Sequence, residues 1–147
     1  MTNVLSLRVK GTAQDISAAT MQVGQFIEGN GYKKNSSTVS VTHGLEVADG
    51  QQILDTEILI PLDKNFTPPE GCTLKSVFKI INAVKIRHEG NPSGLQKTCD
   101  ELMAYIQQRG YTPITAAYIV TVKDVLRPED MDQAVMDVYI GLNPNTL

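Results

Sequence analysis

The stretch Phe26-Ile27-Glu28-Gly29-Asn30-Gly31-Tyr32 decides the fold, because it returns later in the chain as Tyr105-Ile106-Gln107-Gln108-Arg109-Gly110-Tyr111. In both copies apolar residues at helical spacing precede a glycine, and a tyrosine follows that glycine directly. A glycine just after the last periodic residue is typical of a helix that ends in a left-handed residue. The stretch therefore predicts the same helix end twice, with a shift of 79 from residue 26 to residue 105.

Two further blocks repeat in the same order around this helix end. Arg8-Val9-Lys10-Gly11 matches Arg87-His88-Glu89-Gly90 with the same shift, and residues 56–62 match residues 136–142 with a shift of 80. Three matched blocks in one order, with one residue of slippage in a loop, indicate an internal duplication.

Each copy begins with a strand and a helix. The strand alternates apolar and polar side chains, as at Leu5 and Leu7, which is typical of a strand with one buried face. The helix has one apolar face and must pack on another element. Asp15 or Ser17 is the expected N-cap of the first helix, and Ser93 that of the second.

Two strands rich in β-branched residues close each copy, at 38–42 and 53–62 in copy one and at 116–122 and 134–142 in copy two. An antiparallel sheet of this kind buries one face under its helices. The sequence therefore predicts an α+β fold. Its tandem duplicated βαββ units form an antiparallel sheet with the helices packed on one face, related by a pseudo-twofold axis.

The chain is interpreted as a single domain over residues 1–147. Copy one covers residues 1–62, a linker covers 63–72 and copy two covers 73–147. The linker assignment depends on Pro68-Pro69-Glu70-Gly71, a composition typical of turns. Residues 73–81 are expected to form an extra strand or an extended entry into copy two.

Charge and composition exclude several classes of protein. The formal net charge of −3 provides no global attraction to nucleic acid, so no direct nucleic-acid partner is predicted. No apolar run approaches the roughly 20 residues needed to span a bilayer, so no membrane partner is predicted either. The N-terminus has no secretory signal pattern, and cytoplasmic residence is expected. Cys72 and Cys99 match no metal-ligand spacing, and no metal or cofactor is predicted.

Familiar catalytic motifs are missing from the sequence, which leaves a few titratable residues to weigh. His43 is expected at the surface at a strand end. His88 falls in register with apolar positions, so it is either a core or rim histidine held by a carbonyl or a ligand-binding or acid–base group. Glu57 and Asp137 are equivalent carboxylates that open the last strand of each copy. Carboxylates at such positions are usually exposed to solvent, and this is the first interpretation. The alternative is that the two form a symmetric acidic pair at the mouth of a pocket between the repeats, where they would favour cationic ligands.

The tyrosines break the symmetry of the duplication. Copy two carries Tyr105, Tyr118 and Tyr139, where copy one has Phe26, Val39 and Leu59. Aromatic side chains with hydroxyl groups suit flat amphipathic ligands, although tyrosine at the margin of a core is common. If the chain has a site, this asymmetry predicts it in copy two.

The order of these elements resembles the GyrI-like superfamily, which includes the effector-binding domains of bacterial multidrug-responsive transcription activators. The resemblance covers nearly the whole chain and rests on the helix end at Gly110-Tyr111, the turn glycines and the final strands. It implies a ligand-binding cleft between the repeats. Drug-binding members carry a glutamate on the penultimate strand, about where this chain has residues 118–122 without a carboxylate. The sequence shows no helix-turn-helix module, so the chain is similar to an uncharacterised stand-alone member.

Three functions remain open from the sequence. The first is a regulatory module that binds a small amphipathic molecule in the cleft. Its candidate ligand-binding residues are Tyr118, Tyr105, Tyr139, His88, Asp137 and Glu57. The second is a protein-interaction or homodimerisation module without a small-molecule ligand. The third is a hydrolase of the GyrI-like type. An enzyme is the less favoured class, because no nucleophile and base are paired in the sequence, and no catalytic residue is assigned.

Overall fold

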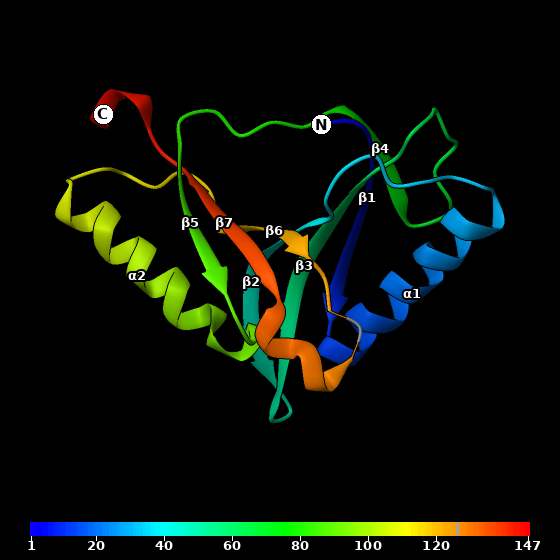
Figure 1. Cartoon of the computed structure of the whole chain (residues 1–147), viewed down its shortest axis with the longest axis horizontal. Helices are drawn as coiled ribbons and strands as arrows, with labels where there is room; N and C mark the ends of the chain where they lie inside the picture. Colours follow the sequence, from blue (N-terminus) through cyan, green and yellow to red (C-terminus); the bar gives the residue numbers. More distant parts are fainter. Residues whose placement is uncertain (126) are drawn as a thin grey trace. The chain divides into compact units, whose positions relative to one another are not determined.

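The computed structural model describes residues 1–125 and 127–147, and the chain divides into two units that repeat one order of elements. Unit 1 is Met1–Lys79 and unit 2 is Ile80–Leu147. The expected α+β class is confirmed, since each unit is an antiparallel sheet with one α-helix on it (Figure 1).

Unit 1 has four strands and one helix in its described residues. Its elements are β1 (Thr2–Gly11), α1 (Ala13–Gly29), β2 (Val39–Ala48), β3 (Gln51–Pro61) and β4 (Cys72–Val77). The strands lie in the order β4-β1-β3-β2, and every neighbouring pair is antiparallel.

Unit 2 repeats the same plan with short 3-10 helices added. Its elements are β5 (Ala83–Glu89), η1 (Pro92–Gly94), α2 (Leu95–Gln108), β6 (Tyr118–Lys123), η2 (Pro128–Gln133), β7 (Val135–Gly141) and η3 (Pro144–Thr146). The strand order β6-β7-β5 corresponds to β2-β3-β1 of unit 1. Strands β2 and β6 even have their register shifts at equivalent places, between Thr42 and Gly44 and between Thr121 and Lys123. The duplication is therefore present in the register as well as in the sequence.

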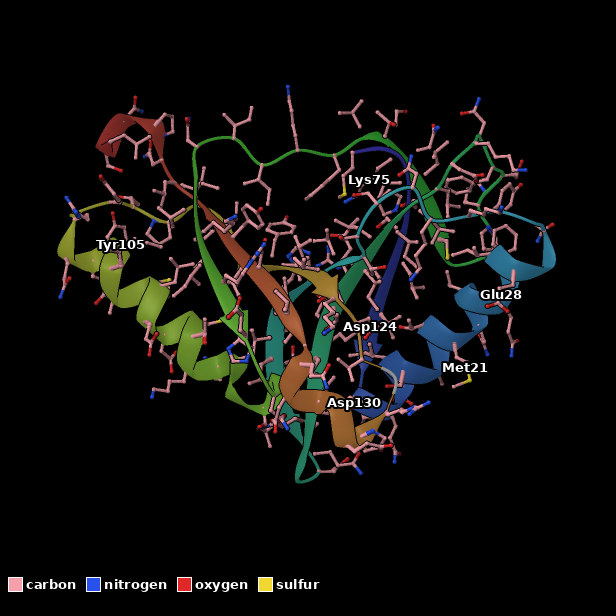
Figure 2. All side chains as sticks on the ribbon, in the orientation of Figure 1. Met21, Glu28, Lys75, Tyr105, Asp124 and Asp130 are labelled. Carbon is pink, nitrogen blue, oxygen red and sulfur yellow. The ribbon has the colours of Figure 1, made fainter. Side chains whose placement is uncertain are left out.

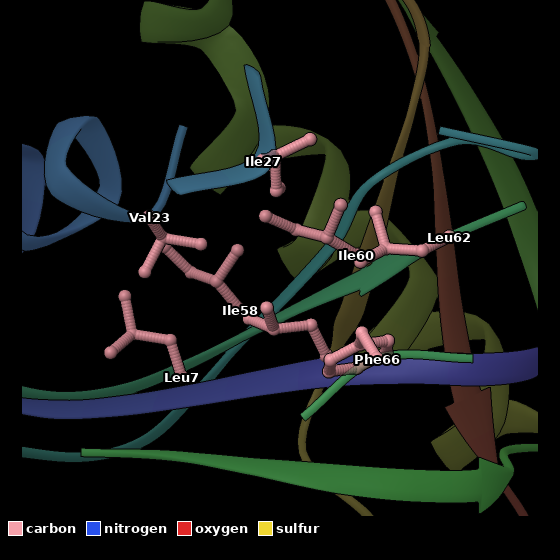
Figure 3. Packing of buried hydrophobic residues seen from close by; sticks show 8 residues of the cluster. Leu7, Val23, Ile27, Ile58, Ile60, Leu62 and Phe66 are labelled. Carbon is pink, nitrogen blue, oxygen red and sulfur yellow. The ribbon is translucent and has the colours of Figure 1, made fainter. Parts of the chain in front are cut away.

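The core of each unit lies between its helix and the sheet. In unit 1, α1 packs on β1 and β3, and the buried apolar side chains are Leu5, Leu7, Val23, Ile27, Ile58, Ile60, Leu62 and Phe66 (Figure 3). In unit 2 the buried set is Leu102, Ile106, Val138, Ile140 and Leu142. Full burial of one such side chain contributes about 1.5–3 kcal/mol, so these two clusters dominate the stability of their units.

The two helix ends have the predicted left-handed glycine. Gly31 has φ 68° and Gly110 has φ 70°. The backbone N–H of Tyr32 donates to the carbonyl of Ile27 at 3.0 Å, and Tyr111 repeats this bond to Ile106 at 3.1 Å. Such a bond satisfies a carbonyl of the last helical turn, and both tyrosines then pack against the core of their own unit.

A second pair of left-handed residues was not predicted. Asn3 has φ 50° and Asn82, its counterpart in unit 2, has φ 53°. The carbonyl of Asn3 accepts the N–H of Leu62 at 3.0 Å, and that of Asn82 accepts the N–H of Leu142 at 2.7 Å. Asparagine tolerates this conformation better than most residues, so the pair Asn3 and Asn82 was a further sign of the repeat.

The expected helix caps need correction. Thr12 is the N-cap of α1, and its hydroxyl accepts the N–H of Asp15, whose carboxylate in turn accepts the N–H of Thr12. Asp15 is thus the third helical residue of a capping box and not the cap itself. In unit 2 the residue before α2 is Gly94, without a side-chain cap, and Ser93 donates its N–H to Asn91.

Removing this cap has a measurable cost. Thr12→Ala is expected to lower the free energy of unfolding by about 1 kcal/mol, because an N–H of the first turn loses its acceptor. Urea unfolding measures the difference, and Thr12→Ser serves as the control that keeps the hydroxyl. Equal stability of the alanine and serine variants would contradict the role of the cap.

The segment between the copies belongs to unit 1. The extra strand predicted within residues 73–81 exists, but β4 pairs with β1 and is not an entry into copy two. The segment before it is more than a linker, since Phe66 is 7% exposed within the core of unit 1. A strand has to satisfy its backbone hydrogen bonds, and the edge of β1 provides the partner.

Candidate functional site

The polar residues of interest lie on the face of each sheet turned away from its helix, called here the far face. Side chains alternate along a strand, so Leu5 and Leu7 face α1 while Ser6 and Arg8 point to the far face. Glu57 lies opposite Arg8 on β3 and therefore shares that face.

Side chains from three strands bind Glu57 of β3. The Ser6 hydroxyl of β1 donates to its Oε1 at 2.6 Å, and the His43 Nε2 of β2 donates to its Oε2 at 3.0 Å. Lys75 of β4 donates to Oε1 from the other side (Figure 2 labels Lys75). Glu57 is 6% exposed, whereas the lysine side chain keeps 37% of its surface in solvent. We call Ser6, His43, Glu57 and Lys75 the Glu57 cluster.

The Glu57 cluster holds its carboxylate in the charged form. Burial raises the pKa of Glu57, but the hydrogen bonds from Lys75, Ser6 and His43 outweigh burial and lower the pKa to about 2 from its ordinary value of 4.5. A buried carboxylate is tolerated when cations and hydrogen-bond donors surround it. Glu57 is consequently an anion at every physiological pH.

A β-bulge brings His43 to this cluster. Thr42 pairs with Thr56 and Gly44 with Asp55, so His43 is the inserted residue without a cross-strand partner of its own. A bulge bends its strand and redirects a side chain. His43 is at the surface as expected, but its ring nitrogen also bonds Glu57.

Unit 2 has a simpler ion pair at the equivalent position. Arg87 binds Asp137 through two hydrogen bonds, Nε to Oδ1 at 2.7 Å and Nη2 to Oδ2 at 2.9 Å. Lys85 Nζ lies 3.8 Å from the same carboxylate. The hydrogen bonds from Arg87 lower the pKa of Asp137 against the effect of burial. Asp137 is 5% exposed.

One substitution between the copies explains why the two ion pairs differ. In unit 1 Arg8 forms its two hydrogen bonds with Asp55, at 2.9 and 2.8 Å, and leaves Glu57 to other donors. In unit 2 the position of Asp55 is Val135, so Arg87 turns to the carboxylate directly across from it, Asp137. The cation that Glu57 then needs comes from β4, a strand that unit 2 lacks among its described residues.

The structure brings together only some of the predicted site residues. Tyr118 and Tyr139 are cross-strand neighbours, and both share the far face of unit 2 with Asp137. Lys85 Nζ lies 6.0 Å from the centre of the Tyr139 ring. Glu57 has the equivalent place in unit 1.

His88 and Tyr105 lie elsewhere in unit 2. His88 Nε2 donates to the carbonyl of Asn91 at 2.9 Å, and its Nδ1 lies 2.7 Å from the Thr98 hydroxyl, which matches a rim histidine held by a carbonyl. Tyr105 is 40% exposed on α2 (Figure 2), with the guanidinium of Arg109 at 5.3 Å from its ring.

The expected solvation of Glu57 and Asp137 is wrong. Both carboxylates lie inside their strands rather than at the start, and their cationic partners Lys75 and Arg87 were not weighed in the sequence argument. Arg87 was available as a signal, because pairing the first strand of a copy with its last strand sets Arg87 opposite Asp137. Lys75 gave no signal, because its reach to Glu57 depends on β4 pairing with β1.

Other kinds of site find no support in the part of the chain that the structure describes. In residues 1–125 and 127–147, no three His, Cys, Asp or Glu side chains are grouped closely enough to hold a metal ion. Cys72 and Cys99 are free thiols, and burial raises the pKa of each. No helix in these residues has both the length and the hydropathy of a membrane span.

Comparison with known proteins places the fold. The sequence matches no family model and no curated protein. Among solved structures, the chain is similar to the EcmrR C-terminal domain, with TM-score 0.78, 14% identity and coverage of 97% of this chain and 91% of that one. It is equally similar to EcmrR in its DNA complex, at TM-score 0.79 and 14% identity. That match includes 97% of this chain but only 54% of the length of the EcmrR chain.

Two proteins of Listeria innocua are also similar. One is an uncharacterised conserved protein, with TM-score 0.68, 13% identity and coverage of 97% of this chain and 88% of that one. The other is a hydrolase, with TM-score 0.59, 13% identity and coverage of 97% and 87%. At these identities the likeness establishes the fold alone. The chain shares the fold of the EcmrR C-terminal domain, which is the GyrI-like fold that the sequence resemblance implies.

Proposed function

We propose that the chain is a binding module for a small amphipathic molecule, with a regulatory rather than a catalytic role. The ligand binds the far face of unit 2, against Tyr118 and Tyr139. The observation that carries the proposal is this cross-strand tyrosine pair, which lies beside the half-exposed cation Lys85 on a fold shared with an effector-binding domain.

The tyrosine pair provides the apolar part of such a site. Directly opposite side chains on antiparallel strands have Cβ atoms about 4.5–5.5 Å apart, so Tyr118 and Tyr139 extend as neighbours from the same face of unit 2. Both side chains are partly buried. In unit 1 the same two positions are the aliphatic pair Val39 and Leu59, which has no hydroxyl groups to orient a ligand.

The ion pairs favour a neutral or anionic ligand over a cation. Asp137 is already engaged by Arg87 on two oxygens, and Lys85 adds a second positive charge beside it. Glu57 is likewise engaged in unit 1. A cationic ligand has to displace one of these internal cations before it gains a carboxylate, whereas an anion is attracted to Lys85 directly. The cleft between the repeats that the resemblance implies stays a prediction.

The hydrolase hypothesis draws less support from these contacts. A carboxylate with a pKa of about 2 is a weak base, and general bases work best when their pKa lies near the operating pH. Both ring nitrogens of His88 are already bonded to Thr98 and Asn91. Among the described residues these contacts leave Glu57 and His88 in structural roles.

Two probes of equal shape and opposite charge test the proposal. Isothermal titration with tetraphenylborate and with tetraphenylphosphonium is expected to show tighter binding of the borate anion. Tyr118→Ala is expected to weaken both probes about tenfold, since aromatic contact is lost. Lys85→Met is expected to reduce the difference between the affinities for the borate anion and the phosphonium cation.

The control is Tyr105→Ala, which removes an exposed tyrosine of α2 away from the far face and should leave both affinities unchanged. Tighter binding of the phosphonium cation would contradict the proposed charge preference. Unchanged affinities in Tyr118→Ala would contradict the site itself.

A further inference from the structure

The internal repeat makes β1 and β5 equivalent strands with different surroundings. β1 pairs with β3 on one side and with β4 on the other, antiparallel from Thr2 opposite Val77 to Leu7 opposite Cys72. β5 pairs with β7 and stands at the end of the strand order, so β7 is its one strand partner in the described chain. An edge strand presents backbone N–H and C=O groups that another strand can use.

The strand β4 also fills space beside α1, and this space is open in unit 2. Cys72 of β4 packs against the core of unit 1, and Phe66 from the segment before it is buried there. In unit 2 a groove of about 310 Å³ lies between β5 and α2. Its lining residues are Val84, Lys85, Ile86, Glu101, Leu102 and Tyr105. We call this the β5 groove.

We propose that the free edge of β5 binds an extended peptide from a partner protein, which adds to unit 2 as an antiparallel strand in the way that β4 adds to unit 1. Strand addition of this kind obtains affinity from main-chain hydrogen bonds and specificity from alternate side chains. One set of alternate side chains enters the β5 groove, toward Val84 and Ile86, and must be apolar. The other set lies on the far face beside Lys85 and Arg87.

The charges on β5 select an acidic peptide. Lys85 and Arg87 are each 48% exposed, both lie near the carboxylate of Asp137, and Glu89 also acts on Arg87 from the end of the strand. The far face of β5 therefore presents two half-exposed cations in the middle of its open edge, with a carboxylate at its Glu89 end. Acidic side chains opposite these cations are favourable, and basic ones are not. The partner is thus a segment that alternates apolar and acidic residues.

The same charges oppose a second copy of this chain on the edge. Antiparallel pairing of two β5 strands centred on Ile86 sets the Lys85 of each copy opposite the Arg87 of the other. Like charges directly opposite each other destabilise a strand pair. This register is therefore unfavourable for a second copy, whereas an acidic strand gains from both cations.

The test uses the full chain labelled with nitrogen-15 and a synthetic peptide, acetyl-Glu-Val-Glu-Val-Glu-Val-Glu-amide, which matches the seven residues of β5 in length. The amide signals of residues 83–89 and of the groove side of α2 are expected to shift on titration. A peptide with lysine in place of glutamate is expected to bind about tenfold more weakly. A peptide N-methylated on alternate residues along the pairing edge is expected not to bind, because it cannot form the hydrogen bonds.

Two charge variants test whether the acidic peptide binds at the β5 edge or is attracted to positive charge anywhere on the chain. Lys85→Glu is expected to weaken the acidic peptide about tenfold, and Lys97→Glu, an equal charge change at an exposed position of α2, is expected to leave it unchanged. Tyr105→Ala removes a wall of the β5 groove and should weaken binding of the peptide without changing the affinity for tetraphenylborate. Tyr118→Ala should weaken binding of tetraphenylborate without changing the affinity for the peptide.

Three results would overturn the inference. The first is a set of shifts on β4 or at Tyr118 in place of β5. The second is equal binding of the N-methylated peptide. The third is a dimer by sedimentation velocity that the acidic peptide does not dissociate and that Lys85→Glu disrupts, which would identify the occupant of the edge as a second copy of the chain.

Discussion

Replacing Lys75 with methionine is expected to lower the free energy of unfolding by about 2–3 kcal/mol. The change leaves Glu57 charged and buried, with only Ser6 and His43 to bond it. Removing one partner of a buried ion pair costs about 3–5 kcal/mol, and the value here is at the lower end because 37% of the Lys75 side chain is in solvent. Urea unfolding near neutral pH measures the difference.

The reverse change is expected to be milder. Glu57→Gln should cost about 1 kcal/mol, since Lys75 can turn its ammonium group into water while the amide keeps its bond from Ser6. A larger loss for Glu57→Gln than for Lys75→Met would contradict this account of the Glu57 cluster.

The pH dependence of stability provides a second measure of the same pair. Folding lowers the pKa of Glu57 from 4.5 to about 2. The stability this provides is complete above pH 4.5 and is lost as the pH falls toward 2, because protons then bind the unfolded chain first. At about 1.4 kcal/mol per pKa unit the shift sets an upper limit of about 3 kcal/mol on this loss, and solvent screening brings the loss toward the roughly 1 kcal/mol expected for Glu57→Gln.

Lys75→Met is expected to flatten this decline, because its Glu57 has a pKa closer to the ordinary value. Urea midpoints at about pH 6, 4 and 2.5 for both proteins make the comparison, and Lys97→Met controls for the loss of an exposed lysine. Parallel declines in the wild type and Lys75→Met would show that Lys75 does not lower the pKa of Glu57.

Ile106→Ala is expected to have the largest effect of any substitution considered, a loss of about 3–4 kcal/mol. Ile106 is a fully buried residue of α2 and belongs to the same core cluster as Val138 and Ile140 of β7. Loss of a large aliphatic side chain in such a position costs the transfer free energy of the missing groups and the energy of the cavity they leave, together about 2–5 kcal/mol. Guanidinium unfolding followed by circular dichroism measures it.

Ile114→Ala is the matched control, since the same side chain is removed at a position that is 59% exposed. It should change the stability by less than about 0.5 kcal/mol. Ile27→Ala, the equivalent change in unit 1, is expected to cost nearly as much as Ile106→Ala. A loss of under about 1 kcal/mol at Ile106 would mean that α2 is not held by this core.

The scaffold could be predicted from the sequence because its signals are local. The helix end at Gly31-Tyr32 can be predicted from one glycine and the apolar helix face that precedes it. The same pattern recurs at Gly110-Tyr111. The strand faces follow from alternation, and the repeat multiplies the evidence for each element. The caps were harder, because Thr12 and Asp15 share the task and either residue alone fits the pattern of an N-cap.

The candidate site could be predicted only in part. Tyr118 and Tyr139 were singled out by the broken symmetry of the copies, and their shared face follows from the strand register. Tyr105 was expected with them by the same argument, but it lies on the exposed surface of α2. His88 was a candidate by its register with apolar positions, and its ring is held by Asn91 and Thr98. Asymmetry between copies identifies changed residues without saying which way they point.

By itself the sequence determined the duplicated α+β plan, its helix ends and the alternation of its strands, because short-range sterics and burial of one face dictate them. The tertiary structure alone decided the state of Glu57, Asp137 and the edge of β5. Those features depend on which strands are neighbours. Strand β4 brings Lys75 to Glu57, and Val135 in place of an aspartate leaves Arg87 to bind Asp137. Among the described residues β5 has no counterpart of the strand that pairs with β1. Pairings over such separations are set by the free energy of the whole sheet, which no local pattern in the chain contains.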